Sequence, residues 1–500
     1  MRSEPSPTPG TGHSDPGHDS AASAVGRRSW WVTGALALFA VVLYGRTLCP
    51  TVGWYDSAEF AATAASLRVV PHPPGYPLYA ILGHIFTWLP GEAALGVNVM
   101  SAVFGVGCVA LLHRVALRFS LGGVAAAVPA ALFVVAPSVW ANAVVAEVYM
   151  PGLAFLLTAV LLCQEAHRRA QPRFAWAAAG VAGLGLGVHM SIATWGLGFA
   201  VLVGRAAWPG LRGAARPAMV RTAARWGLGC ALATAIGASV LLLVPFGPFE
   251  AVTPLGPYED SFARLWARFI ADVQGGVFQR YFKPMPVTYR LQQIGGIARD
   301  NVGVEGLLAA VVGLAWAVRR WPWVAAALAL GAVGNVAFFF RYDVPDLDVF
   351  LLPALVSLML LSGIGVEAAF RFRKTLGWAV AAMLLILVGG RAARNYDTVD
   401  RSTDRSAREY GESVCAVLPA DAILAMTSRP DEWRLYSVVF YMHESGEGCT
   451  DVEFWGIANV DMIDGALKEG RRVYAFVPAP RFGWAFSVRS EGPLYRVSPS

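Results

Sequence analysis

The chain has 500 residues, of which 56% are hydrophobic and only 15% are charged, and its mean hydropathy is +0.50. Soluble proteins carry about a quarter charged residues, so this composition excludes a soluble protein. The net charge of +6 could indicate nucleic-acid binding. The arginines, however, are grouped in short segments between apolar runs of about twenty residues, which predicts a helical polytopic membrane protein surrounded by lipid, with no nucleic-acid partner.

The N-terminal part of the chain predicts a tail followed by a membrane anchor. Residues 1–28 are rich in Pro, Ser, Gly and His, and we expect them to form a disordered cytoplasmic tail. The apolar run from about Trp30 to Leu48 follows two arginines and ends without a small-residue cleavage site. We therefore expect a retained anchor rather than a cleaved signal peptide.

Further apolar runs predict a transmembrane domain over residues 29–392 with about eleven helices. The expected spans lie near 30–48, 95–117, 121–139, 148–166, 174–188, 190–204, 226–246, 302–318, 322–340, 349–370 and 375–390. The count within 174–204 is the least certain part of this assignment. The run 76–89 is apolar but short and bounded by prolines, so we expect it to lie along the interface or re-enter the membrane.

The basic residues predict the orientation, because cytoplasmic loops carry an excess of Lys and Arg. With the N-terminus inside, every expected inner loop is basic. The expected outer loops, 49–94, 138–148, 247–300 and 341–348, carry acidic residues instead. We expect an integral protein of the plasma (inner) membrane with a cytoplasmic N-terminus and an extracytoplasmic C-terminal part.

Residues 393–500 predict a small extracytoplasmic α/β domain. The expected elements are helices at 395–417, 431–443 and 460–468 and strands at 422–427 and 472–477. Cys415 and Cys449 both lie in this domain and can form a disulfide if it is extracytoplasmic. Two free thiols are an equally compatible interpretation.

The first outer loop concentrates candidate catalytic groups. Asp56 and Glu59 are three residues apart and share a face of a helix. Three prolines hold His72 in an extended segment. Two carboxylates beside a fixed histidine at a bilayer edge indicate chemistry. The alternative is that Asp56 caps the helix that follows it and Glu59 faces water.

Other ionisable and aromatic residues are expected on the same outer side, where charged groups at membrane depth are costly and usually functional. These further candidates are Tyr76, Glu147, Tyr149, His189, Arg264, Arg268, Arg280, Lys283, Arg341 and Tyr342. Each has a structural alternative: Glu147 can favour a helix N-terminus, His189 can bond between helices, and the cations can form a solvated face. Their convergence on one side favours function.

Acids and cations together at the outer surface suit the transfer of a sugar from a polyprenyl-phosphate carrier. A carboxylate would take the proton of the acceptor hydroxyl as general base. Arg, Lys and His would neutralise the departing lipid phosphate. Such a donor needs no soluble nucleotide site, and the sequence has no glycine-rich phosphate loop.

The motifs resemble those of the polytopic GT-C glycosyltransferases, and most closely the family of a transmembrane protein O-mannosyltransferase. Four stretches carry the resemblance: Trp54-Tyr55-Asp56-Ser57-Ala58-Glu59-Phe60, His72-Pro73-Pro74-Gly75-Tyr76-Pro77-Leu78, Ala146-Glu147-Val148-Tyr149 and Gly187-Val188-His189-Met190. It implies a GT-C fold and inverting transfer of a sugar, with mannose expected, to a protein, glycan or lipid acceptor.

The resemblance also implies roles for individual residues. Asp56 matches the general base and Glu147 a second acid, while Glu59 is the alternative base or orients Asp56. His72 and the five cations are the candidates for binding the phosphate. No cofactor and no metal is expected to be required, although Asp346-Leu347-Asp348 in a later loop is a weak contrary sign.

Two functions of other classes remain open. A flippase or transporter of lipid-linked sugars should place key charges at the bilayer midplane and show paired internal repeats. A non-catalytic membrane assembly factor would use residues 393–500 as its working part and would tolerate the loss of Asp56 and Glu147.

Overall fold

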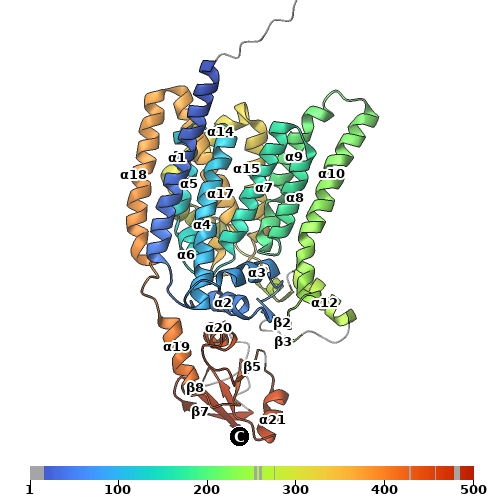
Figure 1. Cartoon of the computed structure of the whole chain (residues 1–500), viewed down its shortest axis with the longest axis vertical. Coiled ribbons are helices and arrows are strands. Elements are labelled where there is room, and N and C mark those ends of the chain that lie inside the picture. The colour runs from blue at the N-terminus through green and yellow to red at the C-terminus, as the bar shows by residue number, and fades with distance from the viewer. Residues whose placement is uncertain are drawn as a thin grey trace, which may run out of the picture.

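The computed structural model describes residues 16–252, 256–257, 262–274, 276–426, 430–456, 458–477 and 485–499. Long helices form a bundle, and a smaller α/β unit lies at one of its ends (Figure 1). The first helix starts at the opposite end of the bundle, so the N-terminal segment and the α/β unit are on opposite sides (Figure 1).

Eight helical segments of the described chain are long and apolar enough to span a membrane. They are α1 (Pro16–Thr47, counted from Ser29), α4 (Ala93–Arg118), α7 (Tyr149–Arg169), η1 with α9 (Met190–Trp195, Gly196–Leu211), α10 with η2 and α11 (Arg216–Ala238, Ser239–Leu242, Leu243–Phe246), α15 (Pro322–Phe339), α17 (Leu352–Phe372) and α18 (Lys374–Val399). Two bent pairs raise the number to ten: α5 (Gly123–Val135) with α6 (Pro137–Ala143), and α13 (Val287–Val302) with α14 (Val304–Arg320). The protein is therefore an integral membrane protein.

The predicted count of eleven spans is not confirmed. The segment 174–188 forms α8 (Pro172–Gly185), whose 14 residues make it shorter than the other spans. Glycines let α8 pack closely on α10, because a methyl group at Gly183 would collide with the carbonyl oxygen of Thr234. Hydropathy does not separate this short, closely packed helix from a full span.

The N-terminal segment also differs from the prediction. Residues 16–28 are helical and continue into the first span as part of α1, whereas we expected residues 1–28 to be disordered. Several alanines in this stretch are strong helix formers, which favours the continuation. Residues 1–15 lie outside the described part of the chain.

A layer of short elements covers the end of the bundle that faces the α/β unit (Figure 1). It comprises α2 (Asp56–Ser66), β1 (Val69–Val70), α3 (Pro77–Phe86), β2 (Ala251–Val252), β3 (Gly256–Pro257), α12 (Phe262–Val273), η3 (Gly276–Tyr281) and α16 (Leu347–Phe350). Strand β2 pairs in parallel with β1 and antiparallel with β3. Helix α3 is the short apolar helix predicted after the first loop.

The α/β unit contains α19 (Ser406–Cys415), α20 (Pro430–Glu444), α21 (Val460–Lys468) and a five-stranded sheet. The strand order is β5 (Glu453–Trp455), β4 (Ile423–Ala425), β6 (Val473–Ala475), β8 (Leu494–Pro499) and β7 (Phe486–Glu491). Strands β5, β4 and β6 are parallel, and β6, β8 and β7 are antiparallel. A disulfide joins Cys415, at the end of α19, to Cys449, after α20.

The α/β unit packs directly on the membrane domain. Ala58, Ala61 and Ala62 of α2 belong to one buried apolar cluster with Tyr436 and Val439 of α20. Helix α20 lies between α2 and the sheet (Figure 1). Small alanines on α2 allow this close approach, so the first outer loop is held between the bundle and the α/β unit.

Candidate active site

The two acids of the first loop occupy the first turn of α2. The helix begins at Asp56 itself, and its N-cap is Tyr55, in a left-handed backbone conformation with φ of 56°. Negative charge is favoured at a helix N-terminus by the exposed N–H groups there. Asp56 is thus not the cap and Glu59 is fully buried, so the alternative of a capping Asp56 and a solvated Glu59 is wrong.

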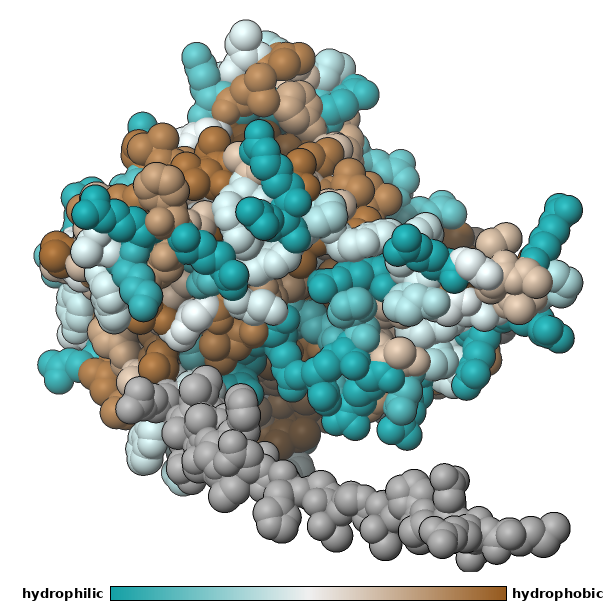
Figure 2. Space-filling model, turned by 90° about the horizontal axis from the view of Figure 1, so that it is seen from above, coloured by the Kyte–Doolittle hydropathy of each residue, from teal (hydrophilic) through white to brown (hydrophobic). Residues whose placement is uncertain are grey.

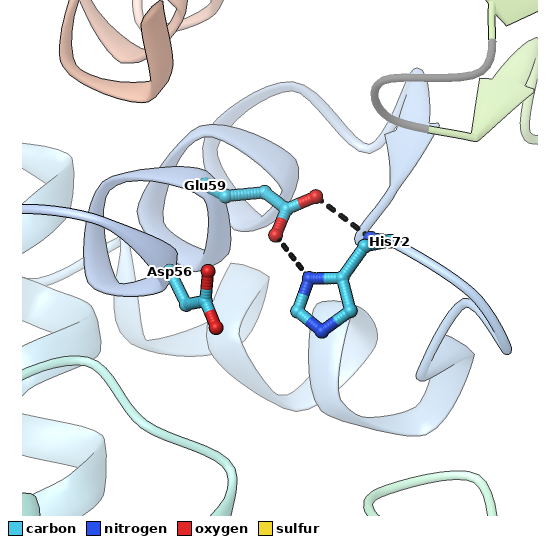
Figure 3. A group of neighbouring side chains, drawn as sticks. All are labelled: Asp56, Glu59 and His72. Atoms are coloured by element: carbon cyan, nitrogen blue, oxygen red, sulfur yellow. Dashed lines mark hydrogen bonds and ion pairs between the residues drawn. The ribbon is translucent and has the colours of Figure 1, made fainter. Parts of the chain in front are cut away.

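Glu59 and His72 form a buried pair (Figure 3). The backbone N–H of His72 donates to Glu59 Oε1 at 2.7 Å, and its Nδ1 lies 2.5 Å from Glu59 Oε2. Burial by itself would lower the pKa of His72, but the charges of Glu59 and Asp56 outweigh it and raise the pKa to about 9. His72 is therefore an imidazolium at neutral pH, held by Glu59.

Asp56 lies beside this pair but has a different environment. It is half-buried, and its Oδ1 accepts a hydrogen bond of 2.8 Å from the indole Nε1 of Trp433 on α20. Side-chain ligand atoms of Asp56, Glu59 and His72 all lie within 4.8 Å of one another. Both oxygens of Glu59 are engaged by His72, so Asp56 is the acid of the loop that can accept a further proton.

Two more carboxyl groups reach the same place from other loops. Burial raises the pKa of Glu147 well above its usual range, and the charges of Asp56 and Asp346 add to the effect. Desolvation raises the pKa of Asp346 to about 6, and the charges of Asp56 and Asp348 add to the effect. Three acids from three segments therefore interact electrostatically at one site.

Asp346 was not among the predicted site residues. Asp348, two residues further on, bonds elsewhere: its Oδ2 accepts a hydrogen bond of 2.5 Å from the hydroxyl of Ser138. The Asp-Leu-Asp spacing was visible in the sequence, but it does not say which of the two acids faces the site. The fold decides this, because α16 begins between them.

Aromatic side chains and a second histidine line the other wall of the site. The ring of Tyr76 lies 5.4 Å from His72 and 5.6 Å from His189, and Tyr149 lies 5.1 Å from His189. Tyr342 joins this wall through Phe350, at 5.1 Å. Burial and the charge of His72 lower the pKa of His189 to about 3, so this second histidine is neutral.

His189 makes a local contact: its Nδ1 lies 2.7 Å from the hydroxyl of Ser191, two residues on. A small, partly open pocket lies beside His189 and Tyr149, which line it together with apolar side chains. Its lining includes Leu153, Leu156, Ile192, Val349 and Leu352. Apolar side chains of the bundle thus lie next to His189 and Tyr149.

The predicted phosphate-binding cations lie on neighbouring segments. Phe278 of η3 contacts His72 with ring centroids 5.7 Å apart, which brings the following residues to the rim of the site. Arg280 lies over the ring of Tyr281 at 5.1 Å, and Lys283 is 3.4 Å from Asp343.

The remaining cations are less closely tied to this rim. Arg268 is 4.0 Å from Asp272 on its own helix, α12, where Arg264 is exposed. Arg341 is exposed, and its carbonyl oxygen accepts the backbone N–H of Lys283.

A buried arginine that sequence analysis did not single out supports the loop carrying Tyr342 and Asp346. Arg290 is fully buried in α13, and its Nη2 donates to the carbonyl oxygen of Tyr342 at 3.0 Å. Its Nη1 donates to Gln293 at 2.7 Å. Nothing in the sequence distinguishes Arg290 from the other arginines of the 247–300 segment.

Residues 56–206 match the family model described as the Protein O-mannosyl-transferase TMEM260 N-terminal domain. The expected family resemblance is confirmed. The mouse protein described as Protein O-mannosyl-transferase TMEM260 is 33% identical over 180 residues, which cover 35% of this chain and 25% of that protein. The chain thus spans about a quarter of the length of this relative. The matched region contains Asp56, Glu59, His72, Glu147 and His189.

Solved structures show the fold over nearly the whole chain. The ArnT protein of Cupriavidus metallidurans, bound to undecaprenyl phosphate, has a TM-score of 0.57 and 15% identity, with 94% of this chain and 98% of that chain covered. The mycobacterial arabinofuranosyltransferase AftD has a TM-score of 0.53 and 14% identity, with coverage of 94% and 40%. The chain therefore has the predicted GT-C fold of membrane glycosyltransferases.

Proposed function

We propose that the protein is a membrane glycosyltransferase that moves a sugar, mannose, from a polyprenyl-phosphate carrier to an acceptor hydroxyl with inversion at the anomeric carbon. The observation that carries the proposal is the half-buried Asp56 next to the charged His72, at the end of a membrane bundle. The names of the mouse relative and of the ArnT complex support the sugar and the carrier, respectively.

Asp56 acts as the general base. As the acceptor oxygen attacks the anomeric carbon, its proton passes to Asp56, and the bond between the sugar and the phosphate oxygen breaks. Oδ1 is held by Trp433, which leaves Oδ2 for the proton. Inversion follows because the base and the departing phosphate act on opposite faces of the sugar.

His72 stabilises the leaving group. Its Nδ1–H is directed at Glu59, and the second ring nitrogen points away from Glu59 (Figure 3). That N–H and the cations at the rim, Arg280 and Lys283, neutralise the lipid phosphate as it departs.

Glu147 and Asp346 bind the hydroxyl groups of the sugar or of the acceptor. The raised pKa of Glu147 favours its protonated form, which donates as well as accepts hydrogen bonds. Asp346, with a pKa of about 6, is mainly ionised at pH 7 and accepts hydrogen bonds. The acceptor is a protein, a glycan or a lipid, and the name of the mouse relative favours a protein.

We infer that the site and the α/β unit lie on the extracytoplasmic side of the plasma membrane. A disulfide between Cys415 and Cys449 fits an oxidising compartment. Helices α4, α7 and α17 start at the site end and carry basic residues in their last turns, at the other end of the bundle. Figure 2 views that opposite end, where hydrophilic side chains cross the surface between hydrophobic ones.

The test of this function is an assay with purified protein, radiolabelled polyprenyl-phosphate mannose and an extract of membranes and extracytoplasmic proteins. Transfer of label to a product is expected, and the fraction that carries the label identifies the class of acceptor. A chloroform-insoluble product indicates a protein or glycan acceptor, and a lipid product indicates a lipid acceptor. Binding of the labelled lipid without transfer, for mannose and for other sugars on the same carrier, would instead favour a flippase.

The rate of transfer is expected to fall as the pH rises through about 9. The folded-state pKa of His72 is raised to about 9, so its charged form dominates below that pH and is lost above it. The measurement is kcat/KM against pH for wild type and His72→Gln. The variant should be slower at every pH and should lack this alkaline limb; an unchanged limb would assign the titration to another group.

Transfer is also expected to need no divalent metal. Asp56, Glu59 and His72 have ligand atoms close enough to hold an ion. His72 Nδ1, however, carries a proton and donates it to Glu59, so this nitrogen has no lone pair for a metal. We expect activity after treatment with EDTA to stay within about 2-fold of the untreated enzyme, since no ligand bond is lost. A large loss that Mg²⁺ or Mn²⁺ restores would contradict this.

A further inference from the structure

The α/β unit reaches the acid proposed as the base. Three aromatic residues of α20, Trp433, Tyr436 and Phe440, follow one another on one face of the helix, with stacked rings 5.9 Å and then 5.7 Å apart. At the membrane end of this row, the indole Nε1 of Trp433 donates to Asp56 Oδ1 at 2.8 Å. The row therefore runs from the core of the unit to the reacting centre.

The residues just before Asp56 are held by the same unit. The guanidinium of Arg434 lies 4.2 Å from the centre of the Trp54 ring and 5.9 Å from that of Tyr55. The indole of Trp54 donates to the hydroxyl of Ser406 at 2.8 Å. These contacts hold Trp54 and Tyr55, the two residues before the first turn of α2, against the α/β unit.

The chemistry of an indole suits one role in particular. Its N–H only donates, so it cannot take the proton that Asp56 must accept. Bonded to Oδ1, it restricts the rotation of the carboxylate and leaves Oδ2 out of this hydrogen bond. Within the described part of the chain, no hydrogen bond to Oδ2 is made. A donor to one oxygen and an open second oxygen are what an oriented general base requires.

We propose that Trp433 is a positioning residue for Asp56, so that the α/β unit completes the active site of the membrane domain. This inference rests on the proposed function. It predicts that the two parts form one catalytic unit, and that the hydrogen bond contributes to the rate of the chemical step rather than to the binding of the donor.

The test compares Trp433→Phe with Trp455→Phe in the full-length protein. Phenylalanine keeps an aromatic ring next to Tyr436 and removes the N–H together with part of the indole ring. The control variant loses the same part of the ring. Trp455 is the matched control, because it lies in the same unit and its Nε1 also donates to a carboxylate, Glu453, at 2.7 Å, away from the site.

Trp433→Phe is expected to lower kcat by about 10- to 100-fold, with KM for the donor within about 2-fold of wild type, because a hydrogen bond to a charged group is lost. Trp455→Phe should match wild type. Equal kcat values for the two variants would overturn the proposal, and so would a change confined to KM.

A second measurement does not depend on activity or on the stability of the Trp433 variant. The indole ¹H–¹⁵N resonance of Trp433 should shift in Asp56→Asn, while that of Trp455 should not. An unmoved Trp433 resonance overturns the contact even if wild type transfers sugar. If wild type is inactive with every donor, the proposed function is wrong. The resonance then still tests whether Trp433 donates a hydrogen bond to Asp56.

Discussion

Replacing Asp56 by asparagine is expected to lower the rate of sugar transfer by about 1,000-fold, the range that general-base catalysis contributes. Asparagine has nearly the same shape and keeps an oxygen that can accept the hydrogen bond from Trp433. It cannot accept the proton of the attacking hydroxyl. The measurement is the initial rate with radiolabelled polyprenyl-phosphate mannose, together with the binding of the labelled donor, which should be unchanged.

The matched control for this variant is Asp300→Asn. Asp300 is exposed on α13 and pairs with Arg299 at 3.1 Å, and such surface pairs contribute little to stability. This control should transfer sugar like wild type. Full activity of Asp56→Asn would remove Asp56 from the mechanism and turn attention to Glu147 and Asp346.

Replacing Glu59 by glutamine is expected to lower kcat at pH 7 by about 100-fold, the cost of removing one stabilising donor from a developing negative charge. Glu59 itself touches no substrate in this mechanism. Without its charge, burial dominates and lowers the pKa of His72, so the imidazole is neutral when the phosphate departs. Unlike Asp56→Asn, this variant should therefore regain activity as the pH is lowered.

The same substitution gives a stability test with a defined sign. The pKa of His72 rises from 6.5 to about 9 on folding, which stabilises the protein by about 3 kcal/mol below pH 6.5 and no longer does so once the pH exceeds 9. Thermal unfolding in detergent should show Glu59→Gln melting below wild type at about pH 6, with a difference that shrinks towards pH 10. Glu453→Gln, on the surface of the α/β unit, is the control; an equal difference at all pH values would mean that Glu59 acts by packing alone.

The sequence pointed to the first loop, and the structure brings Asp56, Glu59 and His72 of that loop together. The features that pointed to it are local: two acids at helical spacing, a histidine between prolines and an apolar run on each side. Local features of this kind do not depend on contacts with distant segments. The sequence favoured Asp56 as the base, but the different surroundings of Asp56 and Glu59 were not predictable. The two acids differ in burial, and α20, far away in the sequence, forms part of those surroundings.

The parts that the sequence did not predict have a common cause. Strands β5, β7 and β8 were missed because they are short or carry mixed polar residues, and their pairing partners are distant in the chain. The count of spans is not confirmed at α8, where glycine-mediated packing on α10 allows a helix of 14 residues. Each of these outcomes is decided by contacts between segments, which hydropathy along a single segment does not contain.

The contact between Trp433 and Asp56 joins residues 377 positions apart. A ribosome adds about 5–20 residues per second, so the later residue is made on the order of 20 to 75 s after the earlier one. During that interval the helix bundle can already be inserted while the apolar face of α2 is uncovered and the carboxylate is unsupported. A chain whose synthesis stops before residue 400 lacks both the cover of α2 and the hydrogen bond from Trp433. On this proposal, an incomplete chain therefore has an unsupported Asp56 and a low rate of transfer.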